Sequence, residues 1–428
     1  MSVAINKLKG IVVDQNNNFQ GKSLGVIREI EFEKYLHTDK IVILTGMRRT
    51  GKSTLLRQFA QHFENYHFLN FDDERLLNFD LSDFENLILI FKQLNESKIL
   101  FFDEIQNIPH WENFVRRLHD EDYKVFITGS NAKLLSSELS THLTGRYQKI
   151  EIYPFSFREV LKYFDFNCQK FDQSTVQKSF ILQKFDWYFQ NGGLPEMIKY
   201  QDFEIILKTY EDIIYRDIIS RFAIRDIKTL KQVSFYLFNN IATEFSYQNI
   251  KNILNIASTT TVKNFVSYLE DAYLIFELFK YDYSLKKQFI NNKKCFGIDH
   301  GLQKKLSISP SLNLGRILEN IVFLELKRRG KTVFFHRNKY ECDFVTWENN
   351  QIKELFQVCY DFNAQNRTRE IAGLVEAMET YQIEQGVILS FDQEEIIEQA
   401  NRKILVVPVW QWLIEDKLTM GLEEKNNI

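Results

Sequence analysis

The stretch of sequence that decides the fold reads IVILTGMRRTGKS and runs from Ile41 to Ser53. Its first part, Ile41–Leu44, is a short apolar run, which is typical of a buried parallel strand. Leu55–Phe59, shortly after the loop, has helical spacing. A strand, a glycine-rich loop and a helix in this order are the context that the phosphate-binding pattern GxxxxGKS/T needs.

The chemistry of this loop follows from its residue types. Gly46 and Gly51 let backbone N–H groups curl around phosphates, and the N-terminus of the following helix adds partial positive charge. Lys52 is expected to reach the β- and γ-phosphates, and the Ser53 hydroxyl is expected to ligate Mg²⁺. The stretch therefore predicts the binding of a nucleotide with a magnesium ion.

Two further apolar runs end in polar residues that suit the same site. Ile99–Phe102 predicts a buried strand that is followed by Asp103 and Glu104. An Asp in this position holds Mg²⁺ through water, and the adjacent Glu polarises the attacking water. A third strand, Val125–Ile127, leads into Thr128–Asn131, where a polar side chain can sense the γ-phosphate. A turn built from small polar residues is the alternative for this last segment.

Arg146, within Leu143–Tyr147, is a candidate arginine finger, because an Arg near the γ-phosphate neutralises charge in the transition state. Its action in its own subunit or in a neighbour is open, and so is a plain salt bridge. The expected catalytic residues are Lys52, Glu104 and Arg146, and the expected metal ligands are Ser53 and Asp103. The expected nucleotide-binding residues are Gly46, Arg48, Arg49, Thr50, Gly51, Lys52, Ser53, Thr54, Ser130 and Asn131.

Several motifs together resemble one group of proteins. They are GMRRTGKST, FFDEIQNIPHWENFVRRL, ITGSNAKLL, LTGRY and YPFSFREVL. Their combination resembles the AAA+ ATPases of the AAA domain 14 type, which usually end in a region of the DUF4143 type. The resemblance implies a P-loop NTPase α/β fold, with a five-stranded parallel sheet, helices on both faces and the nucleotide at the carboxyl ends of the strands. It also implies ATP as the nucleotide and a helical lid after the core.

The chain is expected to divide into four domains: a P-loop core at 1–155, a helical lid at 156–228, a winged helix at 229–305 and a DUF4143-type domain at 306–428. The third helix of the winged helix is expected to begin at the N-capping run Ser258–Thr261. Val262, Phe265, Val266 and Leu269 then mark its buried face. Wing strands are expected at Leu274–Phe279 and Cys295–Asp299.

The winged helix has residues that suit contact with DNA, although winged helices also serve protein contacts. A single Lys on the expected recognition helix is a weak signal for DNA, so a DNA partner and a protein partner are both open. The residues expected to reach phosphates and bases are Thr260, Lys263, Asn264, Ser267, Lys286, Lys287, Lys293 and Lys294.

The last region has the parts of a PD-(D/E)xK nuclease, in which acids bind Mg²⁺ and a Lys helps to activate water. Glu319 lies on an expected helix and Asp343 follows a strand, but Gln357 and Cys359 stand where Glu and Lys are expected. Gln is a poor ligand for a hard cation, and Cys does not replace the charge of Lys. The sequence therefore predicts a restriction-endonuclease-like fold with degenerate chemistry, in which Glu319, Asp343 and Gln357 form at most a weakened metal site.

Composition narrows the functional classes. The formal net charge is −3, which gives no general argument for a nucleic-acid partner. The N-terminus lacks an apolar core of signal-peptide length, and no window approaches about 18 apolar residues, so no membrane span is expected. The cysteines show no metal-ligand spacing, and Cys342 and Cys359 are expected to be buried thiols. The sequence thus predicts a cytoplasmic protein.

Three hypotheses follow for the function. The favoured one is Mg²⁺-dependent ATP hydrolysis in a nucleotide-gated switch, with a protein partner or an oligomer possible. The alternatives are an ATP-regulated DNA-binding protein and a metal-dependent nuclease, of which the missing Lys at position 359 counts against the nuclease.

Overall fold

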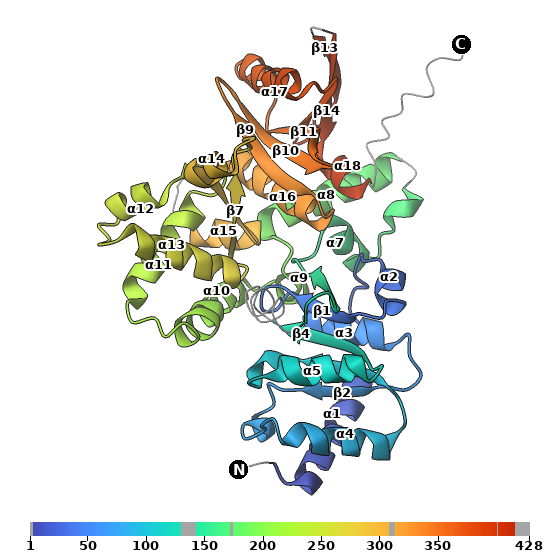
Figure 1. Ribbon diagram of the computed structural model, residues 1–428. Helices are drawn as coiled ribbons and strands as arrows, with labels where there is room; N and C mark the ends of the chain where they lie inside the picture. Colours follow the sequence, from blue (N-terminus) through green and yellow to red (C-terminus); the bar gives the residue numbers. More distant parts are fainter. Residues whose placement is uncertain (1–2, 130–142, 172–173, 308–312, 400, 416–428) are drawn as a thin grey trace. The chain divides into compact units, whose positions relative to one another are not determined.

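The computed structural model describes residues 3–129, 143–171, 174–307, 313–399 and 401–415 (Figure 1). The chain divides into two units. Unit 1 comprises Met1–Ile152 with Asp271–Tyr273, and unit 2 comprises Tyr153–Glu270 with Leu274–Ile428. Within the described ranges, no helix has the length and apolar character that a membrane crossing requires.

Unit 1 contains a five-stranded sheet whose neighbouring strands are all parallel, in the order β2-β3-β4-β1-β5. This confirms the sheet that the resemblance implied. The inner strands β3, β4 and β1 are short and mostly apolar because helices cover both faces of the sheet, whereas the edge strand β5 is largely polar. The strands are β1 (Ile41–Thr45), β2 (His67–Asn70), β3 (Ile99–Asp103), β4 (Lys124–Gly129) and β5 (Tyr147–Glu151).

Alternate residues of each strand point into two different cores. One core includes Ile43 of β1 and apolar side chains of α4 (Asp83–Leu94) and α5 (Trp111–Asp120). The other includes Val42 of β1 and apolar side chains of α3 (Lys52–Ala60). The other helices among the described residues of this unit are α1 (Ile5–Gly21), α2 (Phe32–Leu36), η1 (Glu74–Leu76) and η2 (Ile105–Asn107).

The first half of unit 2 is largely helical. It includes a three-stranded sheet in the order β6-β8-β7, within the segment expected to form a winged helix. The predicted buried face of α13 is confirmed, because Val262, Phe265, Val266 and Leu269 are buried. The elements are α7 (Phe157–Tyr163), η4 (Cys168–Lys170), α8 (Thr175–Asn191), α9 (Pro195–Tyr200), α10 (Phe203–Asp212), the π-helix η5 (Ile213–Ser220), α11 (Ile227–Asn239), β6 (Glu244–Phe245), α12 (Tyr247–Ile253), α13 (Thr259–Asp271), β7 (Ile275–Phe279), α14 (Leu285–Ile290), β8 (Lys293–Gly297) and α15 (His300–Leu306).

One prediction for the wing is wrong. β8 begins at Lys293 rather than at Cys295, so Lys293 and Lys294 are strand residues. Their exposures are 7% and 2%, because both faces of this strand are covered. They are therefore unable to contact DNA as surface lysines, whereas Thr260, Lys263, Asn264, Lys286 and Lys287 are exposed as predicted and Ser267 is half-buried.

The second half of unit 2 is a six-stranded mixed sheet in the order β13-β14-β12-β11-β10-β9, of which β11, β12 and β14 are parallel. The parallel order of these strands brings their carboxyl ends to one edge. The elements are α16 (Leu314–Arg328), β9 (Thr332–Arg337), β10 (Glu341–Glu348), β11 (Gln351–Cys359), α17 (Arg367–Tyr381), β12 (Gln385–Ser390), β13 (Glu395–Gln399), β14 (Arg402–Pro408) and α18 (Val409–Ile414).

The close contact of α17 with β10 gives a stability prediction. A Cβ added at Gly373 would lie 1.9 Å from the carbonyl oxygen of Glu341, so the helix must move away from the strand. We expect Gly373→Ala to lower the free energy of unfolding by about 1–3 kcal/mol in urea denaturation. Gly10→Ala in α1 is the control, because no atom lies within 4 Å of its Cβ. Equal stabilities of the two variants would contradict this account.

Candidate functional site

The loop after β1 has the conformation that its glycines predict. Gly46 has φ +147°, and a Cβ there would lie 2.2 Å from the carbonyl oxygen of Ile152. Gly51 has φ +96° and directly precedes α3. Both positions therefore need glycine for a backbone reason. The N-cap residue of α3 is Gly51, which makes no side-chain capping bond, and the N-terminus of a helix attracts an anion.

Lys52 is held over this loop. Its Nζ donates to the carbonyl oxygens of Gly46 and Met47, each at 3.0 Å, and the residue is 5% exposed. These acceptors are neutral, so the positive charge of the ammonium is not cancelled by them. The loop thus combines a buried cation with the N-terminus of a helix, the two features that favour phosphate binding.

The other residues predicted to bind nucleotide differ in their exposure to solvent. Arg48, Ser53 and Thr54 are half-buried, and so is Arg49, which has φ +67°. Thr50 is fully buried and its Oγ1 donates to the Met47 carbonyl oxygen at 2.8 Å, so this side chain shapes the loop. Ser130 and Asn131 lie outside the described residues.

Three residues that support the loop were not predicted from the sequence. Nη1 of Arg28 donates to the Thr50 carbonyl oxygen at 2.8 Å, and Oε1 of Gln58 accepts from the Arg28 backbone N–H at 3.1 Å. Within unit 1, the Tyr273 hydroxyl donates to Oγ1 of Thr45, directly before Gly46, at 2.8 Å. These contacts span 22, 30 and 228 residues, so no local pattern could have predicted them.

Asp103 and Glu104 lie at the same edge of the sheet as the loop. Oγ1 of Thr128 donates to Oδ1 of Asp103 at 2.5 Å and accepts from the Glu104 backbone N–H at 2.9 Å. Glu104 has φ +52°, and its carboxylate accepts a hydrogen bond from Gln106. One hydroxyl thus orients both acidic residues, and this role of Thr128 differs from the predicted sensing of phosphate.

The environment of Glu104 suits a general base. Burial raises the pKa of its carboxyl group above the usual range, and the charges of Lys52 and Arg48 act against that shift. The interaction with Lys52 also indicates that β3 and the loop contribute to one site. A carboxylate with a raised pKa accepts a proton from water more readily than an ordinary one.

Arg146 lies at the amino ends of the parallel strands, whereas the loop lies at their carboxyl ends. It precedes β5, and its carbonyl oxygen accepts from the backbone N–H of Ile41, the first residue of β1. The loop follows the opposite end of β1, about 16 Å away for strands of this length. Nε of Arg146 lies 3.3 Å from Oδ1 of Asp120. A role for Arg146 in the site of its own subunit therefore conflicts with this geometry.

The predicted C-terminal residues Glu319, Asp343 and Gln357 do share one cavity, of about 420 Å³. Lys294 was not part of the prediction, and it does not line the cavity, but its Nζ lies against three carboxylates that do. This ammonium is 3.5 Å from Oε2 of Glu319, 3.2 Å from Oδ1 of Asp343 and 2.5 Å from Oε1 of Glu341. The lysine missing at position 359 is thus matched by a lysine from β8.

Gln357 is held by partners of its own. Its Nε2 donates to Oε2 of Glu370 on α17 at 2.7 Å, and its Oε1 accepts from the Asp343 backbone N–H at 3.3 Å. The register of β10 shifts between Cys342 and Val345, which turns Asp343 toward the cavity. Cys342 and Cys359 are buried, as predicted.

The Lys294 ammonium and the carboxyl groups around it shift one another's pKa values. Burial disfavours the ammonium of Lys294, but Glu319, Asp343 and Glu341 outweigh it and raise its pKa. Burial raises the pKa of Asp343 to about 6, against the effect of Lys294, and raises that of Glu319 well above its usual range. In the part of the chain that the structure describes, no group of three or more His, Cys, Asp or Glu is arranged to hold a metal ion. The predicted weak metal site is therefore better described as a buried ion-pair cluster.

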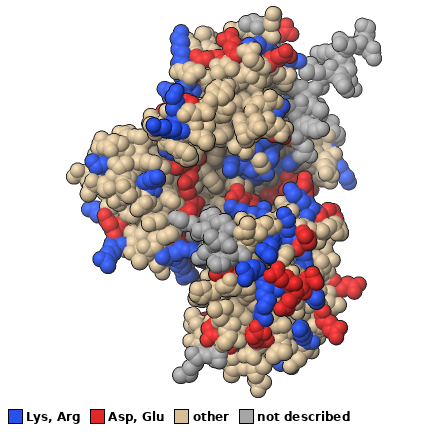
Figure 2. All heavy atoms as spheres, viewed as in Figure 1, with Lys and Arg blue, Asp and Glu red and all other residues tan. Residues whose placement is uncertain are grey.

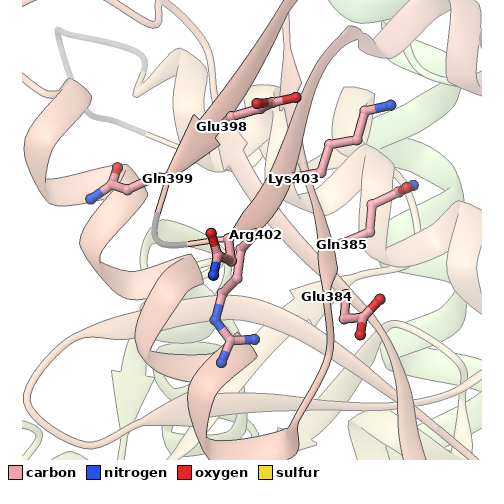
Figure 3. Close-up of a pocket in the computed structure, with 7 residues that line it drawn as sticks. Glu384, Gln385, Glu398, Gln399, Arg402 and Lys403 are labelled. Carbon is pink, nitrogen blue, oxygen red and sulfur yellow. The ribbon is translucent and has the colours of Figure 1, made fainter.

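A second polar cavity of about 690 Å³ lies at the starts of β12 and β14 (Figure 3). It is at the amino ends of the parallel strands, opposite Gln357 near the carboxyl end of β11. Nη1 of Arg402 is used structurally there, because it donates to the carbonyl oxygens of Met378 and Ile383. None of the predicted site residues lines this cavity.

The Lys294 cluster gives a prediction about stability and pH. Lys294→Met leaves buried carboxylates without their cation, and we expect a loss of about 3–5 kcal/mol in unfolding free energy at neutral pH. Carboxyl groups with raised pKa values bind protons more strongly in the folded state, so stability falls as pH rises through those values. The deficit should therefore be larger at about pH 8 than at about pH 5. The exposed Lys287→Met is the control, and a deficit independent of pH would contradict the assignment.

Comparisons with known proteins agree with this architecture. A family model described as an AAA domain matches residues 38–161, and a domain of unknown function (DUF8612) matches residues 182–312. The second match runs across the predicted boundary between residues 228 and 229. The DUF4143-type assignment of 306–428 stays a prediction.

Relatives of this chain are uncharacterized proteins. MJ1544 of Methanocaldococcus jannaschii is 39% identical over 94% of this chain and 94% of its own length, and a protein of Haemophilus influenzae is 31% identical over 89% and 96%. Among solved structures, the S. cerevisiae Hsp104:casein complex aligns at 18% identity with a TM-score of 0.32, over 65% of this chain and 61% of that one, which is too low to support an argument. The chain therefore belongs to the family of MJ1544 and has an AAA+ ATPase domain with the P-loop NTPase fold in its N-terminal unit.

Proposed function

We propose that this protein is a Mg²⁺-dependent ATPase that acts as a nucleotide-gated switch. The observation that carries the proposal is the placement of Glu104. Glu104 follows the carboxyl end of β3, on the side of the sheet where the P-loop follows β1. Its carboxyl group has a raised pKa and interacts with Lys52. A phosphate-binding loop alone supports binding, whereas a general base beside it supports hydrolysis.

Each residue has a role that follows from its contacts. Lys52 exchanges the carbonyl oxygens of Gly46 and Met47 for phosphate oxygens, with the N–H groups of the loop and of α3 around them. Ser53 and Asp103 are the oxygen donors for Mg²⁺, a hard cation that neutralises phosphate charge when bound. Glu104 accepts a proton from the attacking water.

Arg146 fits this proposal as a residue that acts in a neighbouring subunit. Its position at the opposite edge of the sheet removes it from its own phosphates. An arginine supplied by a second subunit stabilises the charge of phosphoryl transfer in the same way as one supplied within the subunit. The ATPase would then be active only as an oligomer.

The alternative of ATP-regulated DNA binding has less support than the sequence alone suggested. Of the lysines expected to contact DNA, Lys263, Lys286 and Lys287 are exposed and Lys293 and Lys294 are buried. Basic and acidic side chains are interspersed on the face seen in Figure 2. A DNA-contacting winged helix at 229–305 stays a weaker proposal.

The finer assignment of 306–428 to a degenerate DUF4143-type domain belongs to the same proposal. It is supported by the shared cavity of Glu319, Asp343 and Gln357. Nuclease activity is not part of it, because Lys294 stands where the cation of such a site would lie.

The roles of Lys52 and Glu104 are separable by experiment. We expect Lys52→Ala to abolish binding of a fluorescent ATP analogue. Glu104→Gln should keep that binding and lower phosphate release at least about 100-fold, because only the general base is lost. Lys92→Ala, on the exposed face of α4, should leave both unchanged. Equal hydrolysis by the wild type and both site variants would contradict the proposal.

The role of Arg146 is testable by mixing. Arg146→Ala alone should lower turnover about a thousandfold or more, and Lys52→Ala alone should be inactive. A mixture should regain activity, because Lys52→Ala subunits supply Arg146 to the intact P-loops of the others. No gain on mixing, together with full activity of Arg146→Ala, would exclude the finger.

A further inference from the structure

Four large apolar side chains are exposed in and beside the short helix α14. The exposures are 82% for Tyr283, 69% for Leu285, 67% for Phe289 and 70% for Ile290. Lys286 and Lys287 are exposed between them. We call these six residues the α14 face, and it is both apolar and cationic.

The base of this segment is fixed while its face is exposed. Nε2 of Gln288 donates to the Asp282 carbonyl oxygen at 2.6 Å, and the Phe289 ring lies edge-on to Phe279 at 5.8 Å. A six-residue helix has little stability of its own, so these contacts hold it in a defined position. A fixed apolar cluster that no core covers indicates a binding surface.

Unit 1 has a groove that is also apolar but carries acidic instead of basic side chains at its rim. The segment between β2 and α4 lines a cavity of about 960 Å³ with a largely apolar floor. Leu77 is 83% exposed and Leu81 is 46% exposed at this cavity. Asp72, Glu74 and Asp80 are exposed around the same cavity. We call it the acidic groove.

We propose that the α14 face of one molecule docks into the acidic groove of a second copy of this chain. The apolar side chains of the face match Leu77 and Leu81, and Lys286 and Lys287 match the acidic rim. Two unlike surfaces on one chain give a head-to-tail contact, which leaves one free face and one free groove at the ends of every assembly.

The charges favour a protein copy over nucleic acid as the occupant. The rim of the acidic groove repels a polyanion, and the net charge of the chain is −3. The α14 face has four apolar side chains for two lysines, which suits a partly apolar partner better than phosphates. A contact built on one short helix is small, so we expect weak, concentration-dependent assembly with dissociation on the order of micromolar.

The test is sedimentation velocity of the full-length chain from about 1 to about 100 µM, a range that brackets weak association. Wild type should grow beyond a dimer as concentration rises. Phe289→Asp, which places a charge on the α14 face, and Leu77→Lys, which places a cation in the acidic groove, should each stay monomeric. Val176→Asp in α8 and Leu89→Lys in α4 are the controls, because both residues are exposed and lie outside the two surfaces.

Mixing the two variants distinguishes a head-to-tail contact between copies from docking within one chain and from a symmetric contact. An equimolar mixture of Phe289→Asp and Leu77→Lys should form a dimer and nothing larger, because one intact face and one intact groove remain. A wild type that stays monomeric, or a mixture that stays monomeric, would overturn the proposal, since docking within one chain and a symmetric contact both predict no rescue. Dissociation of the control variants would also overturn it. Thermal unfolding of each variant verifies that it is folded.

Discussion

The register of β1 between β4 and β5 sets the position of every part of the nucleotide site. All the strands run in one direction, so Thr45, Asp103 and Gly129 end at the same edge. Backbone pairing therefore brings the P-loop, the acidic pair and Thr128 to the same side of the sheet. The same register places the start of β5, and hence Arg146, at the amino ends of the strands, away from the P-loop.

The sequence predicted the parts of unit 1 that depend on local patterns. Short apolar strands and a glycine loop before a helix are readable because backbone needs and solvent exclusion dictate the residue types there. Arg146 could also have been placed, since a residue that precedes a parallel strand lies at its amino end. Arg28, Gln58 and Tyr273 could not, because only the folded chain brings them to the loop.

Lys294 shows a different limit of sequence reasoning. A Lys-Lys pair near an expected wing is ordinarily solvated, and its burial depends on α16 and β10, 25 and 49 residues away. Lys52 and Lys294, two of the buried lysines among the described residues, also differ in chemistry. Lys52 donates to the neutral carbonyl oxygens of Gly46 and Met47, whereas Lys294 is surrounded by carboxylates.

The hydrogen bond from Tyr273 to Thr45 means that unit 1 is not one continuous piece of sequence. A fragment that ends at Ile152 would contain the whole parallel sheet, yet it would lack the hydroxyl that contacts the residue before the P-loop. Excision of the AAA core at that boundary would thus remove a native partner of β1. Recombination at the same point would likewise separate Thr45 from Tyr273 unless residue 273 came with the core.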